Sequence, residues 1–128
     1  ADEPTTALDA VVQRDVLELM VDLTREHNTV VLMISHDLPM VARYTERMVV
    51  MQHGKVLETG ATAAILERPQ HPYTRKLLAA VPVAEPGRHI DTSLIEGEIP
   101  SPVRRVGDEP AIIPLVEFAP GHQVARAA

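Results

Sequence analysis

The sequence predicts an α/β fold, and three of its features lead to that expectation. Apolar residues recur at helical spacing from residue 10 to about residue 26, which predicts an amphipathic helix. The continuous β-branched and apolar run Thr29 to Ile34 is typical of a strand buried on both faces of a parallel sheet. A second such run, Arg47 to Gln52, meets Lys55 to Thr59 across His53-Gly54, and this pattern predicts a hairpin.

The helices have recognisable ends. Asp9 is a favourable N-cap for the first helix, and Asn28 can supply its left-handed stop. The apolar face of that helix carries Val12, Val16, Leu19, Met20 and Leu23. Asp37 can cap a short second helix, which tolerates Pro39 in its first turn.

Prolines organise the second half of the chain. A short helix ends before Pro69, Pro72 suits the first position of the next helix, and Pro82 prevents that helix from continuing. Seven of the eleven prolines lie from Pro82 onward, where no periodicity is sustained, so we expect an extended appendage with short strands at best.

Composition narrows the classes of function. The 128 residues suit one domain or part of one, and 45% hydrophobic with 2% aromatic residues implies a modest aliphatic core. A formal net charge of -6 argues against a dominant nucleic-acid surface. Without cysteine there are no disulfides or thiolate metal sites. The apolar runs are far shorter than the ~20 residues that a membrane-spanning helix needs.

Two adjacent acids, Asp2 and Glu3, precede Pro4 and so lie at the predicted end of a strand. Phosphoryl transfer to water needs a magnesium ion on the phosphate oxygens and a group that aligns the water, and two carboxylates can divide these tasks. Taken alone, Asp-Glu-Pro is common and is better explained as a solvated turn. His36 follows the other predicted strand, and an imidazole there can be a phosphate sensor or merely a structural or exposed side chain.

The stretches Ala1 to Asp9 and Ile34 to Asp37 resemble the Walker B motif, D-loop and switch histidine of ABC-type ATPases. The resemblance implies that Glu3 and His36 are catalytic, Glu3 polarising the attacking water and His36 sensing the γ-phosphate. It further implies that Asp2 and Asp9 bind the cofactor, with Asp2 holding Mg²⁺ through a water ligand. The D-loop residues ending at Asp9 would meet a partner subunit. Asp37 is better explained as a helix cap than as a catalytic acid.

The phosphate-cradling loop GxxxxGK[ST] occurs nowhere in the sequence, and no initiator Met or hydrophobic strand precedes the acids. We therefore expect the carboxyl-terminal part of a P-loop NTPase (ABC ATPase) fold with a proline-rich carboxyl-terminal extension. The division expected is residues 1–68 for the nucleotide-binding domain and residues 69–128 for the extension. Such a fragment cannot complete a nucleotide site alone, so we expect it to be inactive.

A second resemblance concerns the transported substrate. The stretch Pro69 to Arg75, with Gly60 to Thr62 before it and Val81-Pro82 after it, resembles the carboxyl-terminal extension of oligopeptide, dipeptide and nickel importer ATPases. Apart from the family, the same stretch would be an ordinary packing helix. The tail segments Gly97 to Pro102 and Pro114 to His122 agree in part, but many relatives carry a Cys-containing stretch between them and this chain has none.

Together the resemblances imply an ATP-hydrolysing subunit of a bacterial ABC importer for peptides or nickel, with ATP and Mg as cofactors. The implied partners are a second nucleotide-binding subunit in a homo- or heterodimer, transmembrane permease subunits and, indirectly, a periplasmic or extracellular solute-binding protein, with no nucleic acid. The implied location is peripheral, on the cytoplasmic face of the cell membrane. Two alternatives remain: a non-transport ABC-type ATPase of DNA repair or translation, and a non-catalytic truncated remnant.

Two expectations concern burial. His27, His53, His89 and His122 share no metal-ligand spacing and are expected at the surface. The runs Thr29 to Ile34 and Arg47 to Gln52 are both expected to be buried on two faces against strands upstream of residue 1. Without those neighbours we expect a partly molten, aggregation-prone chain.

Overall fold

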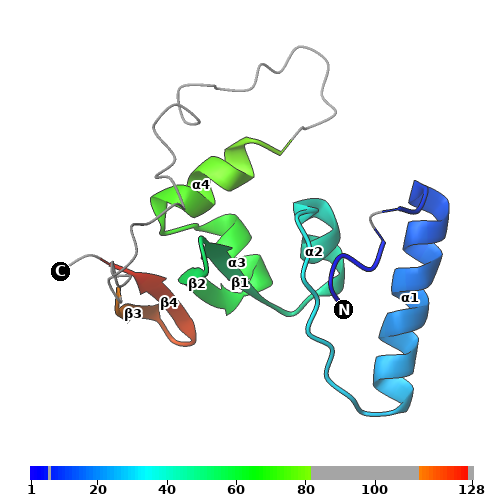
Figure 1. Cartoon of the computed structure of the whole chain (residues 1–128). Helices are drawn as coiled ribbons and strands as arrows, with labels where there is room; N and C mark the ends of the chain where they lie inside the picture. Colours follow the sequence, from blue (N-terminus) through cyan, green and yellow to red (C-terminus); the bar gives the residue numbers. More distant parts are fainter. Residues whose placement is uncertain (6, 82–112, 127–128) are drawn as a thin grey trace, which may run out of the picture. The chain divides into compact units, whose positions relative to one another are not determined.

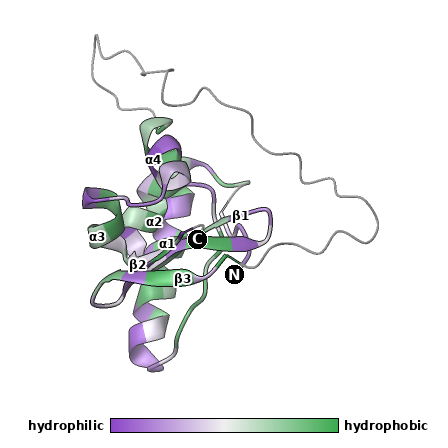
Figure 2. Ribbon diagram, turned by 90° about the vertical axis from the view of Figure 1, so that its left-hand side faces the viewer, coloured by the Kyte–Doolittle hydropathy of each residue, from purple (hydrophilic) through white to green (hydrophobic). Residues whose placement is uncertain are grey.

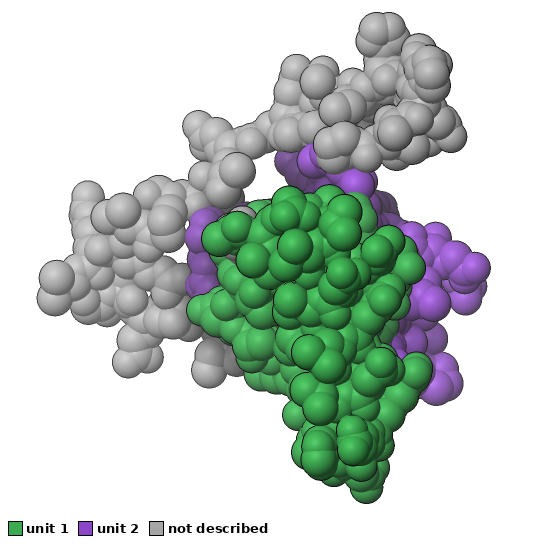
Figure 3. Space-filling model, turned by 90° about the vertical axis from the view of Figure 1, so that its right-hand side faces the viewer, with its two compact units in different colours: residues 1–45 green, residues 46–128 purple. Residues whose placement is uncertain are grey.

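The computed structural model describes residues 1–5, 7–81 and 113–126, and it shows mixed helix and sheet, which confirms the predicted α/β content (Figure 1). The chain divides into two compact units, Ala1–Thr45 and Glu46–Ala128 (Figure 3). Most of the expected proline-rich appendage, residues 82–112, lies outside the described residues, as do Thr6 and the tail segment Gly97 to Pro102.

The first unit contains helices α1, Ala10–Glu26, and α2, Leu38–Tyr44. Both begin at the predicted caps. The Asp9 carboxylate accepts hydrogen bonds from two first-turn N–H groups at 3.0 and 3.1 Å, and the Asp37 carboxylate accepts one at 3.1 Å. After α1 the chain turns at Asn28, whose φ of 47° is the predicted left-handed stop.

The predicted strand Thr29 to Ile34 is wrong in two respects. Among the described residues it forms only an isolated parallel bridge, between Asp2 and Ile34, rather than a ladder. It is also not buried, because Val30 is 97% exposed and Leu32 is 76% exposed. The physical reason is that a parallel strand needs a hydrogen-bonded neighbour along its length, and residues 1–3 supply a neighbour at one position only.

The second unit is built on a four-stranded antiparallel sheet in the order β1-β2-β4-β3. Its strands are β1, Arg47–Gln52; β2, Lys55–Ala61; β3, Leu115–Ala119; and β4, His122–Ala125. The predicted hairpin β1–β2 is confirmed. The strands β3 and β4 form a second hairpin that pairs with β2, so this part of the tail belongs to the sheet instead of extending from it.

The expectation that β1 is buried on two faces is wrong. Met48 and Val50 are 7% and 5% exposed, whereas Val49 and Met51 are 52% and 53% exposed. This alternation is the usual pattern for an antiparallel sheet with one face on the core and the other in water. A run of apolar residues in β1 therefore marks one buried face and one apolar exposed face.

Two short helices pack on this sheet. Helix α3, Thr62–Glu67, lies against β1 and β2, and helix α4, Pro72–Ala79, lies against β2. Both match the predicted short helices. In the described part of the unit, the buried apolar side chains are Met48, Val50, Leu57, Ile65, Val124 and Ala125. Because Val124 and Ala125 come from β4, the carboxyl-terminal hairpin contributes directly to this core.

Candidate functional site

The structure brings the two predicted catalytic residues, Glu3 and His36, into contact. The Ile34 N–H donates to the Ala1 carbonyl and the Glu3 N–H donates to the Ile34 carbonyl, both at 2.9 Å. This bridge aligns the two segments in parallel, so the residues that follow Asp2 and Ile34 emerge side by side. His36 Nδ1 then lies 2.6 Å from Glu3 Oε1.

The chemistry of this pair fixes the roles of the imidazole nitrogens. An ionised carboxylate can only accept hydrogen bonds, so Nδ1 of His36 carries the proton and donates to Glu3. The Nε2 atom is then available for a further partner, and it becomes a donor when the ring is protonated. The His36 side chain is 74% exposed and that of Glu3 is 44% exposed, so an outside group can reach both.

The backbone at Glu3 is unusual, because its φ is 41° in a residue that is not glycine. Non-glycine residues in this region are uncommon and cost of order 1–3 kcal/mol, so they persist where the surroundings impose them. At Glu3 the backbone bond to Ile34 and the side-chain contact with His36 hold the same residue from two sides. The carboxylate is therefore oriented by its local fold.

A small hollow of about 150 Å³ lies beside His36. It is lined by Thr5, Leu8, Gln13, Ser35, His36 and Asp37. Its polar groups are ordered: the Ser35 hydroxyl accepts from the Asp37 N–H at 3.0 Å, and Gln13 Nε2 donates to Asp37 Oδ2 at 3.4 Å. Asp37 caps α2, which agrees with its interpretation as a structural residue.

The two residues predicted to bind the cofactor differ in their surroundings. Asp2 is exposed, adjacent to Glu3 and part of the parallel bridge. Asp9 is engaged as the N-cap of α1. Among residues 1–5, 7–81 and 113–126, no group of three or more acidic, His or Cys side chains could hold a metal ion. A single exposed carboxylate nevertheless fits Mg²⁺, which commonly binds one or two carboxylates together with substrate phosphates and water.

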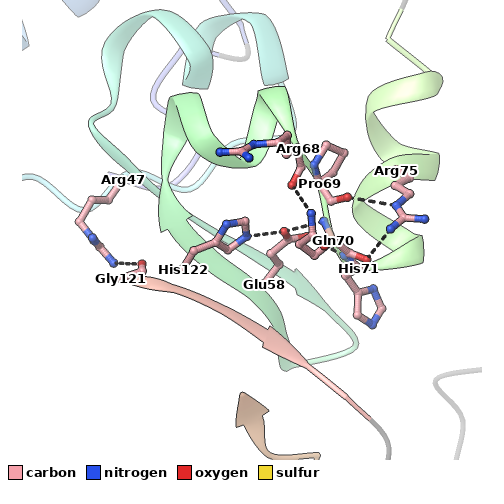
Figure 4. A network of polar contacts seen from close by, with 9 residues as sticks. All are labelled: Arg47, Glu58, Arg68, Pro69, Gln70, His71, Arg75, Gly121 and His122. Atoms are coloured by element: carbon pink, nitrogen blue, oxygen red, sulfur yellow. Dashed lines mark hydrogen bonds and ion pairs between the residues drawn. The ribbon is translucent and has the colours of Figure 1, made fainter. Parts of the chain in front are cut away.

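A second polar cluster, in the unit Glu46–Ala128, was not predicted (Figure 4). Its centre is Glu58 on β2, which is 0% exposed. Glu58 Oε1 accepts from the Gln70 N–H at 2.9 Å and lies 2.7 Å from His122 Nε2, and Oε2 accepts from the His71 N–H at 3.0 Å. The cluster therefore joins β2, β4 and the start of α4.

Burial alone disfavours an ionised Glu58 and raises its pKa, but the groups around it reverse this effect. The side chain of Thr74, the backbone N–H of Gln70, the His122 side chain and the backbone N–H of His71 together hold the pKa of Glu58 below its ordinary value. The Thr74 hydroxyl lowers the pKa as a neighbouring dipole, although it is buried and forms no hydrogen bond of good geometry. Glu58 is thus a buried, charged carboxylate.

The imidazole of His71 has a different task. Its Nδ1 accepts from the Tyr73 N–H at 3.1 Å and so caps the first turn of α4. Burial lowers the pKa of His71, while the negative charge of Glu58 partly offsets that effect. A neutral ring is what the cap requires, because a protonated Nδ1 could not accept.

The expectation that His122 lies at the surface is wrong, since this residue is 4% exposed. A metal-ligand spacing test could not detect its role, because its partner Glu58 lies 64 residues earlier and is reached only through the pairing of β2 with β4. Glu58 was missed for the same reason. A charged residue in a strand normally indicates a solvent-facing position, and no local signal showed that β4 would cover it.

Comparisons with known proteins bear on the predicted resemblance. The predicted resemblance is confirmed: over essentially its whole length the chain is similar to the carboxyl-terminal part of ATP-binding proteins of importers. Residues 57–107 match the family described as "Oligopeptide/dipeptide transporter, C-terminal region". This match begins in β2 and includes the His-Pro-Tyr sequence at the start of α4.

Several similar proteins are named as glutathione import ATP-binding proteins. The chain is 48% identical over 127 residues to the glutathione import ATP-binding protein GsiA of Pectobacterium atrosepticum, 46% identical to that of Salmonella typhimurium and 44% identical to that of Escherichia coli K12. In each case 98% of this chain is aligned. The chain spans 20%, one fifth, of the length of these curated relatives. In the part of the chain that the structure describes, no helix is long and apolar enough to cross a membrane.

Proposed function

We propose that this chain supplies the hydrolytic residues of an ATPase subunit in an ABC importer for peptides. The observation that carries the proposal is the Glu3–His36 contact, 2.6 Å between Oε1 and Nδ1, formed where two paired segments end. Glu3 orients and polarises the attacking water, and His36, with a proton on each ring nitrogen, donates from Nε2 to the γ-phosphate. The relatives named as glutathione import proteins support a peptide-like substrate.

In this proposal Asp2 would hold Mg²⁺ through a water ligand, and the ion would supply neutralisation of charge on the phosphate oxygens of ATP. Asp9, in the D-loop, caps α1 and thereby fixes the segment that meets the second nucleotide-binding subunit. Residues 1–68 complete the nucleotide-binding domain and residues 69–128 form the transporter-type extension. This functional division differs from the compact units, which divide after Thr45, and from the family match, which starts at residue 57.

The proposed partners follow from the class of protein. Two nucleotide-binding subunits close on ATP, and the closed dimer acts on membrane permease subunits, with a solute-binding protein upstream of them. The subunit is peripheral, at the cytoplasmic face of the membrane. The match of residues 57–107 to a transporter region favours this proposal over an ABC-type ATPase of DNA repair or translation.

The test uses a complete ATPase subunit that contains these 128 residues. In the Glu3→Gln variant we expect ATP binding to persist while phosphate release falls on the order of a hundredfold or more, because the amide keeps the shape but not the charge of the carboxylate. His36→Ala should behave in the same way. The exposed acid at the end of α1 provides the control, Glu26→Gln, which should leave turnover unchanged. Near-normal turnover in Glu3→Gln or His36→Ala would remove that residue from the mechanism.

A second expectation concerns the 128-residue chain by itself. Its sequence has no GxxxxGK[ST] loop to cradle the phosphates, so it should show no magnesium-dependent ATPase activity. The measurement is phosphate release from purified chain with ATP and Mg²⁺, compared with buffer alone. Activity that is present in the chain and absent from its Glu3→Gln variant would contradict the expectation.

A further inference from the structure

The carboxyl-terminal hairpin and the His-Pro-Tyr segment meet at a single buried side chain, Glu58. One of its oxygens serves two elements, because Oε1 accepts from the Gln70 N–H and from His122 Nε2. The other oxygen accepts from the His71 N–H. Because Glu58 is 0% exposed, the groups that donate to its carboxylate come from the protein around it.

The position of the His122 ring is defined by its neighbours on two further sides. A Cβ atom on Gly60 would lie 3.4 Å from Cα, Cγ and Cδ2 of His122, so His122 packs directly against the backbone of Gly60. The Phe118 ring stands edge-on to the His122 ring, with their centroids 5.5 Å apart and their planes at 76°. The His122 ring is therefore held between β2 and β3. Figure 4 shows its Nε2 directed at the carboxylate of Glu58.

The segment that Glu58 contacts is also held from its carbonyl side. Arg75 donates from Nε to the Pro69 carbonyl at 3.0 Å and from Nη2 to the Gln70 carbonyl at 3.1 Å (Figure 4). The anionic Glu58 thus accepts hydrogen bonds from the N–H groups of this loop, and the cationic Arg75 donates hydrogen bonds to its carbonyl groups. Because the loop precedes α4 directly, these contacts set where that helix begins.

We propose that Glu58 is a positioning residue that couples the hairpin β3–β4 to the His-Pro-Tyr segment, so that the conformation of residues 69–75 depends on His122. The matched family region ends at residue 107. The coupling means that the hairpin β3–β4, which lies beyond that region, affects the conformation of a segment inside it. The physical basis is that a buried carboxylate stays charged only while its donors are complete. Removal of His122 leaves the buried charge of Glu58 with too few donors. The unit relieves this energetic cost when the hydrogen bonds from the Gln70 and His71 N–H groups to Glu58 open to water.

The experiment uses the full 128-residue chain labelled with ¹⁵N, and it compares amide hydrogen exchange in His122→Ala with the unaltered chain. The amides of Gln70 and His71 should exchange at least about tenfold faster in the variant, and their proton shifts should move upfield as the charged acceptor is lost. The His122→Gln variant, which keeps an N–H donor, should restore much of the protection. The control is Gln123→Ala, next to His122 but exposed on β4, which should change neither amide.

The pattern of the changes separates coupling from general destabilisation. Coupling predicts faster exchange at residues 70–71 and 115–125 with little change in β1, whereas a cavity that merely lowers stability would accelerate exchange throughout the unit. If His122→Ala fails to fold, His122→Asn, whose shorter side chain holds its amide donor further from Glu58, should still shift the Gln70 and His71 amides. Unchanged Gln70 and His71 amides in a folded variant with a perturbed β3–β4 hairpin, or uniformly faster exchange, would overturn the proposal.

Discussion

At the scale of single residues, the two clusters contrast in how far the sequence reveals them. Glu3 and His36 lie in motifs whose types and order indicate their chemistry, and the structure places them in contact. Glu58 and His122 have no such local signature. Their significance depends on strand pairing between positions 64 residues apart, and the residue sequence around either one resembles an ordinary surface. A local sequence pattern cannot predict that a residue is buried by a segment far away in the sequence.

The Glu58 cluster predicts acid sensitivity of the unit Glu46–Ala128. His71 has its pKa lowered from 6.5, so its contribution to stability is complete above pH 6.5 and is lost as the pH falls through the lower, folded pKa. Glu58 has its pKa lowered from 4.5, so its contribution is complete above pH 4.5 and is lost below it in the same manner. Stability should therefore begin to decline below about pH 6.5 and decline further below about pH 4.5.

Urea unfolding between pH 7 and pH 4, followed by far-ultraviolet circular dichroism, measures these slopes. His71→Asn keeps a capping side chain that does not titrate, so it should flatten the decline that begins at the higher pH. Glu58→Gln should lower stability at pH 7 and remove the decline below pH 4.5. The control is His27→Asn, at the histidine that follows α1 and lies outside the cluster. This variant should leave the decline unchanged. Identical pH profiles in the unaltered chain and in His71→Asn would refute the assignment.

At the scale of elements, helix ends and turns were the most predictable features. The caps of α1 and α2, the stop at Asn28 and the β1–β2 turn each depend on one or two residues with strong local preferences. The pairing of strands was less predictable. The apolar runs at 29–34 and 47–52 look alike in sequence, yet one has a single bridge and the other forms a ladder, because pairing requires a second segment whose position local preferences do not encode.

The β1–β2 turn gives a prediction for this element. His53 and Gly54 have φ of 50° and 75°, the arrangement that favours Asn-Gly. Gly54→Ala should destabilise the hairpin by about 1 kcal/mol through backbone conformation alone, since a Cβ there would have no atom within 4 Å. His53→Asn should stabilise it by about 0.5 kcal/mol, because Asn adopts positive φ more readily than His.

The two turn variants should shift the urea midpoint in opposite directions while the slope of the unfolding transition stays constant. They serve as controls for each other, because the altered side chains are adjacent on the same turn. If His53→Asn and Gly54→Ala moved the midpoint in the same direction, backbone conformation would not be the controlling factor.

At the scale of the whole molecule, the two units differ in how their apolar surface is distributed. Among its described residues, the sheet unit buries six apolar side chains, namely Met48, Val50, Leu57, Ile65, Val124 and Ala125. The unit Ala1–Thr45 buries Leu17 and Met40. The segment after α1, which is coloured green for its apolar residues in Figure 2, has Val30 and Leu32 exposed to solvent. Such a surface favours association between molecules.

Association should respond to a charge placed in that segment. Leu32 is 76% exposed, so Leu32→Lys should raise the concentration at which the 128-residue chain remains monomeric, with little change in its unfolding midpoint. Light scattering against concentration, paired with urea unfolding, distinguishes the two effects. Leu17→Lys is the contrasting variant, because Leu17 is 3% exposed and a charge there should unfold α1. Equal aggregation of Leu32→Lys and the unaltered chain would show that association occurs through another surface.

The sheet itself carries a safeguard against the same hazard. Its two outermost strands each contain a register shift, between Val50 and Met51 in β1 and between Glu117 and Ala119 in β3. A shift of this kind bends and twists a strand, so its outward N–H and carbonyl groups no longer form an even row. Neither edge strand therefore offers a flat row of hydrogen-bonding groups to a strand from another molecule. The irregular edges oppose extension of the four-stranded sheet by further strands.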